Sequence, residues 1–506
     1  MEVKDNPSQR LSIWDTRIGM RFAAPPLGDL RFRAPRDPPR TNGTQSAASF
    51  QATCLGSYVG FGLENPQEDC LFINVFTPSN ATTNSKLPVW FYIQGGGYSG
   101  NTNANYNGTE VVVNSGHGVI LVNMNYRVGA FGFLASEKVR RDGDLNVGLL
   151  DQRKAMQWVQ KYIHLFGGDP DHVVIHGASA GAGSIAYHLT AYGGRDEGLF
   201  VGAISESTFF PTHRTVPEME FQFSRFAANV SCPNDANVMS CIRSKDLATL
   251  QSADYYQPFP GRQNAPDWYF LPVVDGTFSP DLLYNLLSQG RFVKVPLLTG
   301  HDTDEGNGFA ANAATNEEFL SFMVDNYPKL TTSQLQRINA SYPLMPPLPL
   351  HAEWFPSAAA AYGDSTFKCP SNYLASSLSR YFSPNRVWNY HYNVTDLTDA
   401  AFGSAVPHTA ETPAIFGPES TDCGDCSYFT YNAPIVPVVM SYWISFVRRL
   451  DPNVERARGS PVWGSFGRGG GQRLKFQIGD TVMEPVDGDQ LRKCEMWRGF
   501  AQTMEQ

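Results

Sequence analysis

The sequence contains no apolar run long enough to cross a membrane. Hydrophobic residues make up 42% of its 506 residues, yet no stretch reaches the roughly 18 apolar residues of a membrane-spanning helix. The longest apolar segment, residues 433–447, is short and contains two prolines. We therefore expect no membrane span, and we interpret this segment as a buried strand or helix.

The chain also lacks an excess of positive charge. Its formal net charge is −9 at pH 7 and it has no basic stripe, which argues against nucleic acid as a partner. An acidic balance mainly favours solubility. Internal repeats, charge blocks and low-complexity linkers are absent as well, so we expect residues 1–506 to form a single domain.

A signal peptide is missing from the first ten residues, MEVKDNPSQR. Either the protein is cytoplasmic, or it is secreted and its signal peptide has been removed. The eight cysteines favour secretion, because Cys54 with Cys70, and Cys232 with Cys241, could close short polar loops as structural disulfides. Six N-x-S/T sequons add modest support, at Asn42, Asn80, Asn107, Asn229, Asn339 and Asn393.

The first half of the chain alternates between strand-like and helix-like segments. Residues 87–93 and 118–126 are nearly continuous apolar runs, typical of strands covered on both faces. Residues 147–163 have the apolar spacing of an amphipathic helix. We expect further strands at 172–177, 200–207, 293–300 and 386–392, and a helix at 182–192. This order predicts an α/β fold with a mostly parallel sheet, whose active site lies beyond the carboxyl ends of the strands.

Two long segments do not follow this alternation. Residues 208–290 and 310–385 are richer in proline, asparagine and aromatic residues. We expect them to be helical or irregular insertions that form a lid or gorge over the edge of the sheet. Phe209 and Phe210, at the start of the first insertion, either shape the site or pack in the core.

The segment VVIHGASAGAGS, residues 173–184, leads from a predicted strand into a predicted helix. Its centre has the pattern G-x-S-x-G, in which the serine occupies a sharp, strained turn and projects its hydroxyl into the site. The residues two positions before and after then face each other closely, so Gly177 and Gly181 supply the necessary space. Tight helix–strand packing is the alternative interpretation, but the strand–turn–helix placement favours Ser179 as a nucleophile.

A serine nucleophile needs preorganised N–H donors for the oxyanion that it generates. The segment QGGGY, residues 94–98, directly follows the predicted strand 87–93. We expect the backbone N–H groups of Gly96 and Gly97, together with that of Ala180, to form an oxyanion hole. The alternative is an ordinary glycine turn.

The nucleophile also needs a base and an acid that orients it. Asp302, Asp304 and Glu305 follow the predicted strand 293–300 and are all candidates for the acid. Of ten histidines, His408 lies in a loop after the predicted strand 386–392, which makes it the candidate base. The order serine, acid, histidine is that of α/β-hydrolases.

Several further blocks resemble the type-B carboxylesterase/lipase family, which includes cholinesterases and fungal lipases. Among them are RFAAPPLGDLRFRAP, NPQEDCLFINVF, NVGLLDQRKAMQWV and TGHDTDEG, and the similarity runs from about Gly19 to the region of Cys494. Secreted fungal members are the most similar. The resemblance implies an α/β-hydrolase fold and a serine carboxylesterase that uses no metal or other cofactor.

The resemblance also assigns roles to individual residues. It implies that Ser179 is the nucleophile, Glu305 the acid, His408 the base, and Ser207 a serine that supports the acid. It matches Gly95 to Gly97 with the oxyanion loop, and it implies disulfides between Cys54 and Cys70, Cys232 and Cys241, and Cys369 and Cys494. Cys423 and Cys426 remain as a C-x-x-C pair, which favours a local disulfide because no second pair is available for zinc.

The chain departs from the family pattern near the expected site. Ala178 stands where the family usually has Glu, Gln94 stands where it usually has His, and the loop between Cys54 and Cys70 contains no tryptophan. A cationic leaving group would lack both that carboxylate and the cation-binding tryptophan, so choline esters are not the expected substrates. Tyr58 and Phe61 could still line an apolar entrance.

These features predict hydrolysis of small to medium apolar esters through an acyl-enzyme. The expected partner is a small-molecule ester. One alternative is an acyltransferase, or a lactone-forming or lactone-opening enzyme of a biosynthetic pathway, that uses the same triad. A more remote alternative is a non-catalytic cholinesterase-like binding protein, although such proteins have typically lost the nucleophile.

Overall fold

A mixed β-sheet runs through the centre of the protein. The computed structural model describes residues 14–57, 66–101, 106–421, 423–468 and 471–506. Within these ranges the sheet has ten strands in the order β1-β2-β4-β3-β5-β6-β7-β8-β9-β10. They are β1 (Trp14–Arg21), β2 (Phe72–Pro78), β3 (Leu87–Ile93), β4 (Ile120–Met124), β5 (Gly168–Ala178), β6 (Gly202–Glu206), β7 (Leu297–Asp302), β8 (Val387–Tyr392), β9 (Gln472–Phe476) and β10 (Val482–Pro485).

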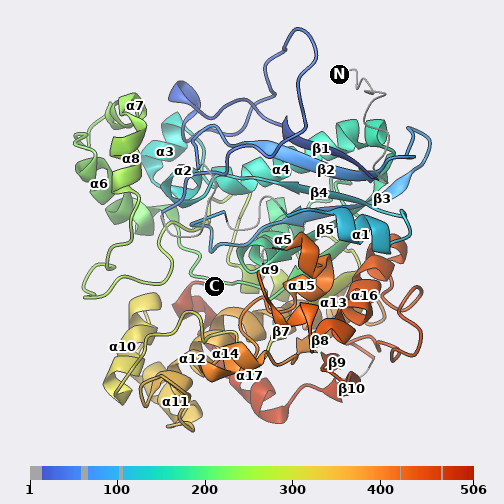
Figure 1. Cartoon of the computed structure of the whole chain (residues 1–506). Helices are drawn as coiled ribbons and strands as arrows, with labels where there is room; N and C mark the ends of the chain where they lie inside the picture. The colour runs from blue at the N-terminus through green and yellow to red at the C-terminus, as the bar shows by residue number, and fades with distance from the viewer. Residues whose placement is uncertain (1–13, 58–65, 102–105, 422, 469–470) are drawn as a thin grey trace.

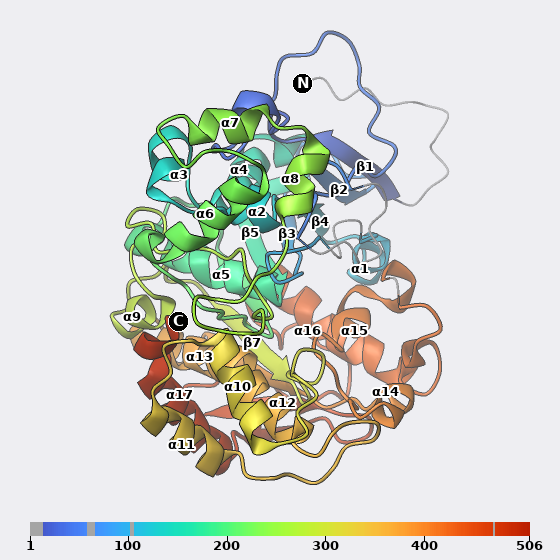
Figure 2. The same ribbon diagram turned by 90° about the vertical axis from the view of Figure 1, so that its left-hand side faces the viewer.

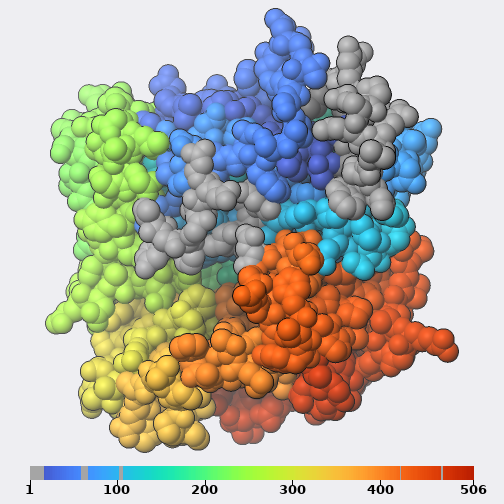
Figure 3. All heavy atoms as spheres, in the orientation of Figure 1, coloured from blue at the N-terminus to red at the C-terminus, as the bar shows by residue number. Residues whose placement is uncertain are grey.

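The central strands run in one direction, and β2 and β10 run against them. The strands from β4 to β9 pair in parallel, whereas β1, β2 and β10 pair antiparallel. In the space-filling view of Figure 3, N-terminal residues (blue) occupy the upper part of one face and C-terminal residues (orange to red) the lower part, in agreement with β1 and β10 at opposite edges. This arrangement confirms the predicted α/β fold.

Helices cover both faces of the sheet, which explains the continuous apolar runs of the central strands. Along β3, Val89 and Phe91 belong to one hydrophobic core, and Trp90 and Tyr92 belong to the other. The first core includes residues of α2 (Gly129–Phe133), α3 (Glu137–Asp142), α4 (Val147–Tyr162), α5 (Ala180–Thr190) and α17 (Gly488–Met504). The second includes residues of α1 (Thr109–Asn114), α15 (Thr412–Phe416) and α16 (Val436–Arg449).

The elements expected from the sequence are present, with ends shifted by a few residues. Residues 87–93 coincide with β3, and the undecided segment 433–447 lies mostly in the helix α16. The strands β1, β2, β9 and β10 have no counterpart among the expected strands. All four lie at the two edges of the sheet, outside the strand–helix alternation on which the expectation rests.

Both insertions contain several helices, which make up the larger part of the second insertion but not of the first. The first contains α6 (Glu220–Asn229), α7 (Val238–Ser244), α8 (Leu247–Ala253) and α9 (Leu283–Ser288), and the second contains α10 (Asn316–Asn326), α11 (Thr332–Ser341), α12 (Phe355–Gly363) and α13 (Cys369–Tyr381). A further short helix, α14 (Leu397–Ala401), follows β8. Figures 1 and 2 show α6 to α8 (green) and α10 to α12 (yellow) on the same side of the molecule, one group above the other.

Four disulfides cross-link the chain. They join Cys54–Cys70, Cys232–Cys241, Cys369–Cys494 and Cys423–Cys426, the same pairs that the sequence and the family resemblance indicated. The third ties the first residue of α13 to α17, across a sequence separation of 125. None of the helices within the described ranges has the length and apolar character needed to span a bilayer.

Candidate active site

Ser179 occupies a strained turn between β5 and α5. Its backbone angles are φ 59° and ψ −123°, a conformation that residues with a side chain rarely adopt. Its N–H donates to the carbonyl oxygen of Glu206 at 2.9 Å, which fixes the turn against the end of β6. The residue is 8% exposed. The hydroxyl is therefore held at the carboxyl end of a central strand.

The two glycines of the G-x-S-x-G pattern make this turn possible. A Cβ atom on Gly177 would lie 2.3 Å from the carbonyl carbon of Gly181, and one on Gly181 would lie 2.0 Å from the carbonyl oxygen of Ile93. A side chain at either position would push α5 away from the sheet. The tight helix–strand packing that was the alternative interpretation of these glycines is therefore also what allows the turn to form.

The glycine loop after β3 lies directly beside Ser179. A Cβ atom on Gly95 would lie 2.9 Å from Cβ of Ser179. Gly96 and Gly97 have φ angles of 103° and 61°, and their N–H groups donate to no acceptor in the described part of the chain. Ala180 is the first residue of α5, so its N–H has no partner within the helix. Three backbone donors therefore remain available next to the serine.

Gln94 anchors this loop from behind. It is 1% exposed, and its Nε2 donates to Oδ1 of Asn101 at 3.1 Å and to the carbonyl oxygen of Met124 at 3.4 Å. The hydroxyl of Tyr126 donates to the carbonyl oxygen of Gln94 at 3.1 Å. The glutamine thus fixes the loop without removing any of its N–H donors.

Glu305 and His408 are hydrogen-bonded to each other. Nδ1 of His408 donates to Oε2 of Glu305, whose other oxygen, Oε1, accepts the backbone N–H of Asp302 at 2.8 Å. Nε2 of His408 is buried and has no hydrogen-bond partner among the described residues. The structure brings acid and base together but forms no hydrogen bond between the imidazole and Ser179. In serine hydrolases this bond often tightens only in the substrate complex.

The other two candidate acids bind the backbone of the histidine loop. Oδ2 of Asp304 accepts the N–H of Val406 at 2.9 Å, on the N-terminal side of His408. Oδ2 of Asp302 accepts the N–H of Thr409 at 2.8 Å, on its C-terminal side. The three neighbouring carboxyl groups therefore differ in role, and Glu305 is the one that contacts the ring.

Ser207 is linked to Glu305 through Asp302. It lies just after β6 with φ 52°, and its N–H donates to the carbonyl oxygen of Gly300 at 2.9 Å. Its hydroxyl donates to Oδ2 of Asp302 at 3.3 Å. Because the backbone N–H of Asp302 in turn holds Glu305, any support from Ser207 passes through Asp302.

Trp268, from the first insertion, lies against the oxyanion loop. A Cβ atom on Gly97 would lie 1.8 Å from Cζ3 of its ring. The indole Nε1 donates to the hydroxyl of Tyr362 at 3.0 Å, which fixes the ring orientation. The ring of Phe209 packs edge-on against Trp268, with 5.4 Å between ring centroids.

Two further rings connect Trp268 to the imidazole of His408. The Phe309 ring lies 5.7 Å from that of Trp268 and 5.1 Å from that of His408. The Phe367 ring lies 4.3 Å from His408 and stacks on Phe209 at 5.5 Å. We call the set Trp268, Phe209, Phe309 and Phe367 the aromatic wall. It bounds the region between the oxyanion loop and His408 with apolar surface.

The aromatic wall shows which of Phe209 and Phe210 lies at the site and which packs in the core. It also contains residues that the sequence did not indicate. Phe209 belongs to it, whereas Phe210 packs in the core against Tyr284 at 5.6 Å. Trp268 and Phe367 come from the insertions, where no periodic pattern marks them. Tyr58 and Phe61, the expected entrance residues, lie outside the described residues.

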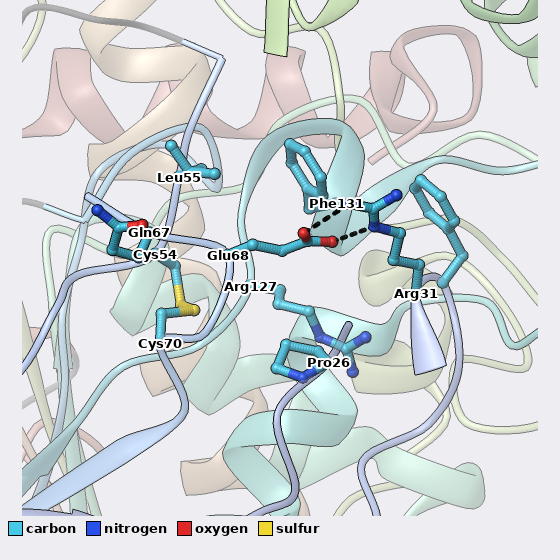
Figure 4. A pocket seen from close by; sticks show the side chains of 10 residues that line it. Pro26, Arg31, Cys54, Leu55, Gln67, Glu68, Cys70, Arg127 and Phe131 are labelled. Atoms are coloured by element: carbon cyan, nitrogen blue, oxygen red, sulfur yellow. Dashed lines mark hydrogen bonds and ion pairs between the residues drawn. A yellow bond between two sulfur atoms is a disulfide. The ribbon is translucent and has the colours of Figure 1, made fainter. Parts of the chain in front are cut away.

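A small cavity lies behind the Cys54–Cys70 disulfide and is separate from this site. Arg31, Glu68 and Arg127 contribute charged groups to its lining (Figure 4). Nη2 of Arg31 donates to Oε2 of Glu68 at 2.8 Å, and Arg127 pairs with the buried Asp151 at 2.7 Å. The described residues that line the cavity include no member of the candidate triad, the oxyanion loop or the aromatic wall.

Comparison with known proteins identifies close relatives of this arrangement. The sequence profile of the carboxylesterase family matches residues 6–497. The chain is 30% identical to Secreted lipase 4 of Gibberella zeae, over 96% of this chain and 88% of that protein. It is also 30% identical to Lipase 2 of Geotrichum candidum, over 94% of this chain and 90% of that protein. The crystal structure of Aspergillus niger EstA superposes with a TM-score of 0.95 at 55% identity, over 98% of this chain and 96% of the other. The superposition confirms the predicted α/β-hydrolase fold.

Proposed function

Because the chain belongs to the carboxylesterase family, we propose that it hydrolyses small to medium apolar esters through an acyl-enzyme at Ser179. The observation that carries this proposal is the hydrogen bond between the buried Glu305 and the half-buried His408. It gives the histidine a defined tautomer and leaves Nε2 as the free basic nitrogen.

The first half of the reaction acylates the serine. Nε2 of His408 takes the hydroxyl proton of Ser179 as its Oγ attacks the ester carbonyl carbon. Glu305 stabilises the imidazolium that forms. His408 then gives the proton to the leaving alcohol as the carbon–oxygen bond breaks, and the acyl group stays on Oγ.

The second half releases the acid. His408 removes a proton from a water molecule, which attacks the acyl carbon, and then returns a proton to Ser179. In both halves, the N–H groups of Gly96, Gly97 and Ala180 donate to the oxyanion. One such donor typically contributes about 10²- to 10³-fold in kcat. This chemistry requires no metal or cofactor.

The aromatic wall supports an apolar acyl group of limited size. Trp268 abuts Gly97, so one side of the oxyanion loop is closed by a large ring that Tyr362 holds in place. Ala178 offers no carboxylate beside the serine, and the Cys54 to Cys70 loop has no tryptophan. A choline-like leaving group would therefore find no tryptophan, the best cation–π partner, in that loop.

We also propose that the protein is a secreted glycoprotein. Its relative in Gibberella zeae is named a secreted lipase, and all eight cysteines are paired. The sequon asparagines Asn42, Asn80, Asn107 and Asn229 are exposed, and Asn339 is half-buried. Asn393 is half-buried, and its Nδ2 donates to Oε1 of Gln477 at 2.8 Å.

The test of the nucleophile combines activity with covalent labelling. Ser179→Ala should lower the hydrolysis of p-nitrophenyl butyrate by a factor on the order of 10⁴ or more and should abolish labelling by a fluorophosphonate. Substantial activity or labelling in the folded variant would reject Ser179. Product analysis with added alcohols would distinguish hydrolysis from acyl transfer, which uses the same groups.

A further inference from the structure

Two buried carboxyl groups, Asp302 and Glu411, face each other beside the candidate triad. Both residues are 0% exposed, and their side chains hydrogen-bond to each other. Oδ1 of Asp302 and Oε2 of Glu411 are buried and accept no N–H or O–H donor of the described residues. Since ionised carboxylates only accept hydrogen bonds, this contact requires a proton on one of the two groups. The pair therefore holds at least one proton.

The surroundings favour retention of this proton. Burial, reinforced by the charges of Glu411 and Glu305, raises the pKa of Asp302 well above its ordinary range. Burial and the charge of Glu206 raise the pKa of Glu411 to about 7. The hydroxyl of Tyr390 donates to Oε1 of Glu411 at 2.6 Å.

Two more tyrosines, Tyr392 and Tyr428, complete the set of titratable groups around the pair, together with His408 beyond Glu305. Burial raises the pKa of both tyrosines above its ordinary value. They therefore remain neutral at the pH at which the carboxyl pair titrates.

Asp302 connects this pair to both the acid and the base. Its backbone N–H holds Oε1 of Glu305 at 2.8 Å, and its side chain holds the N–H of Thr409 at 2.8 Å. Thr409 directly follows His408 and has φ 65°, a conformation that needs support from its surroundings. Asp302 thus restrains the strained backbone that carries the imidazole.

Glu411 restrains the same loop from its far end. It is the N-cap residue of α15, and its carbonyl oxygen accepts the N–H groups of Ala414 and Ile415 at 2.9 and 3.1 Å. Its side chain meanwhile bonds to Asp302 and Tyr390. The backbone between Thr409 and Glu411 is therefore tied at both ends to one hydrogen-bonded carboxyl pair.

We propose that Asp302 and Glu411 form a proton-sharing pair that positions His408 for catalysis, and that loss of the shared proton at alkaline pH releases the histidine loop. This inference rests on the proposed triad. The two residues act through the loop and are positioning residues. A second ionisation would place two negative charges at hydrogen-bonding distance in a buried site, where repulsion is strong. A displacement of the imidazole by about 1 Å is enough to cost on the order of 10²-fold in rate.

Amide substitutions remove the shared proton but preserve the shape of the carboxyl pair. In Asp302→Asn, the amide NH₂ can donate to the Glu411 carboxylate while the amide oxygen still accepts from Thr409. Glu411→Gln preserves the contacts in the same way. Each variant keeps one negative charge and has no proton to lose. Asp302→Ala removes the acceptor for Thr409 altogether.

The experiment measures kcat and KM for p-nitrophenyl butyrate from pH 5 to pH 10. The wild type should lose activity on the alkaline side, whereas Asp302→Asn and Glu411→Gln should retain theirs to higher pH, with neutral-pH kcat within about threefold of the wild type. Asp302→Ala should lose about 10- to 100-fold in kcat with little change in KM.

Asp254→Asn is the matched control. Burial raises the pKa of Asp254 to about 7, but its carboxyl group bonds to the N–H of Ala130 and to Ser57. Its substitution should leave the alkaline limb of activity unchanged. Thermal unfolding of each variant across the pH range shows whether it is folded. If Asp302→Ala does not fold, the alkaline limbs of the two amide variants still test the proposal.

The proposal is overturned if Asp302→Asn and Glu411→Gln have the same alkaline limb as the wild type, or if folded Asp302→Ala keeps full kcat. Failure of the triad has a different signature. Activity that survives His408→Ala rejects the triad, whereas an essential His408 with unchanged profiles in the amide variants rejects only the pair.

Discussion

The indole ring of Trp268 packs against the Cα atom of Gly97, so that no side chain fits at this position of the oxyanion loop. One contact thus links a residue of the first insertion to the backbone that is proposed to stabilise the oxyanion. We therefore expect both the shape of the acyl side and the rate of the chemical step to depend on these two residues.

Gly97→Ala should lower kcat by about 10²- to 10³-fold, the typical effect of losing one oxyanion donor. The added methyl group collides with Trp268, and φ of 61° disfavours any side chain. Gly116→Ala is the control for backbone strain, since Gly116 has φ 65° with open space around it. Steady-state kinetics and thermal unfolding of both variants check the prediction. Equal, small effects in the two variants would contradict it.

Trp268→Ala should shift the preference toward longer acyl chains. Removal of the indole opens space beside the oxyanion loop, and hydrophobic pockets discriminate by about tenfold or more for each methylene that they reject. The measurement is the ratio of kcat/KM for p-nitrophenyl octanoate to that for p-nitrophenyl acetate. Phe210→Leu, a change in the core next to Phe209, should leave the ratio unaltered. A ratio that stays constant in Trp268→Ala would exclude the wall as a determinant of chain length.

Glu305→Gln should reduce kcat less than His408→Ala does. The glutamine can still accept a hydrogen bond from Nδ1 of His408, so the ring keeps its orientation but loses the charge that stabilises the imidazolium. Because His408 transfers the proton itself, its loss should approach that of Ser179→Ala. Single-turnover measurements on both variants under the same conditions check that Glu305→Gln is the more active of the two. Full activity in either variant would argue against the triad.

Asp254 should make folding stability depend on pH. Burial raises its pKa from 3.8 to about 7, so the folded state binds this proton more tightly than the unfolded state does. The resulting stabilisation is fully present below pH 4 and is lost as the pH rises through 7, with a maximum of about 4 kcal/mol. Asp254→Asn removes this titration. Urea unfolding at pH 5 and pH 8 should therefore show a smaller loss of stability in the variant, and an unchanged pH slope would contradict the assignment.

The parts of the site that can be predicted from the sequence are those whose geometry is set by steric contacts between residues close together along the chain. Ser179 is recognisable because its turn demands Gly177 and Gly181 within the same pentapeptide. The strand–helix alternation likewise follows from residues that lie close together along the chain. Glu305 could be separated from Asp302 and Asp304 only through the family resemblance, because all three follow the same strand and only the folded structure shows which one faces the imidazole.

The parts that the sequence does not reveal depend on distant contacts. Trp268 meets Gly97, and Asp302 meets Glu411, only after the insertions and the histidine loop have folded over the sheet. No spacing rule connects such residues. The edge strands were missed for a related reason, since β9 and β10 form a short antiparallel pair outside the alternation of parallel strands and helices.

The Cys369–Cys494 disulfide makes the order of biosynthesis matter for this enzyme. Cys494 emerges from the ribosome long after Ser179 and the strands around it. Phe367 stands two residues before Cys369, so the segment that packs against the imidazole of His408 is covalently secured only when α17 has docked. A nascent chain can thus complete the turn at Ser179 before the disulfide that secures Phe367 beside His408 is able to form.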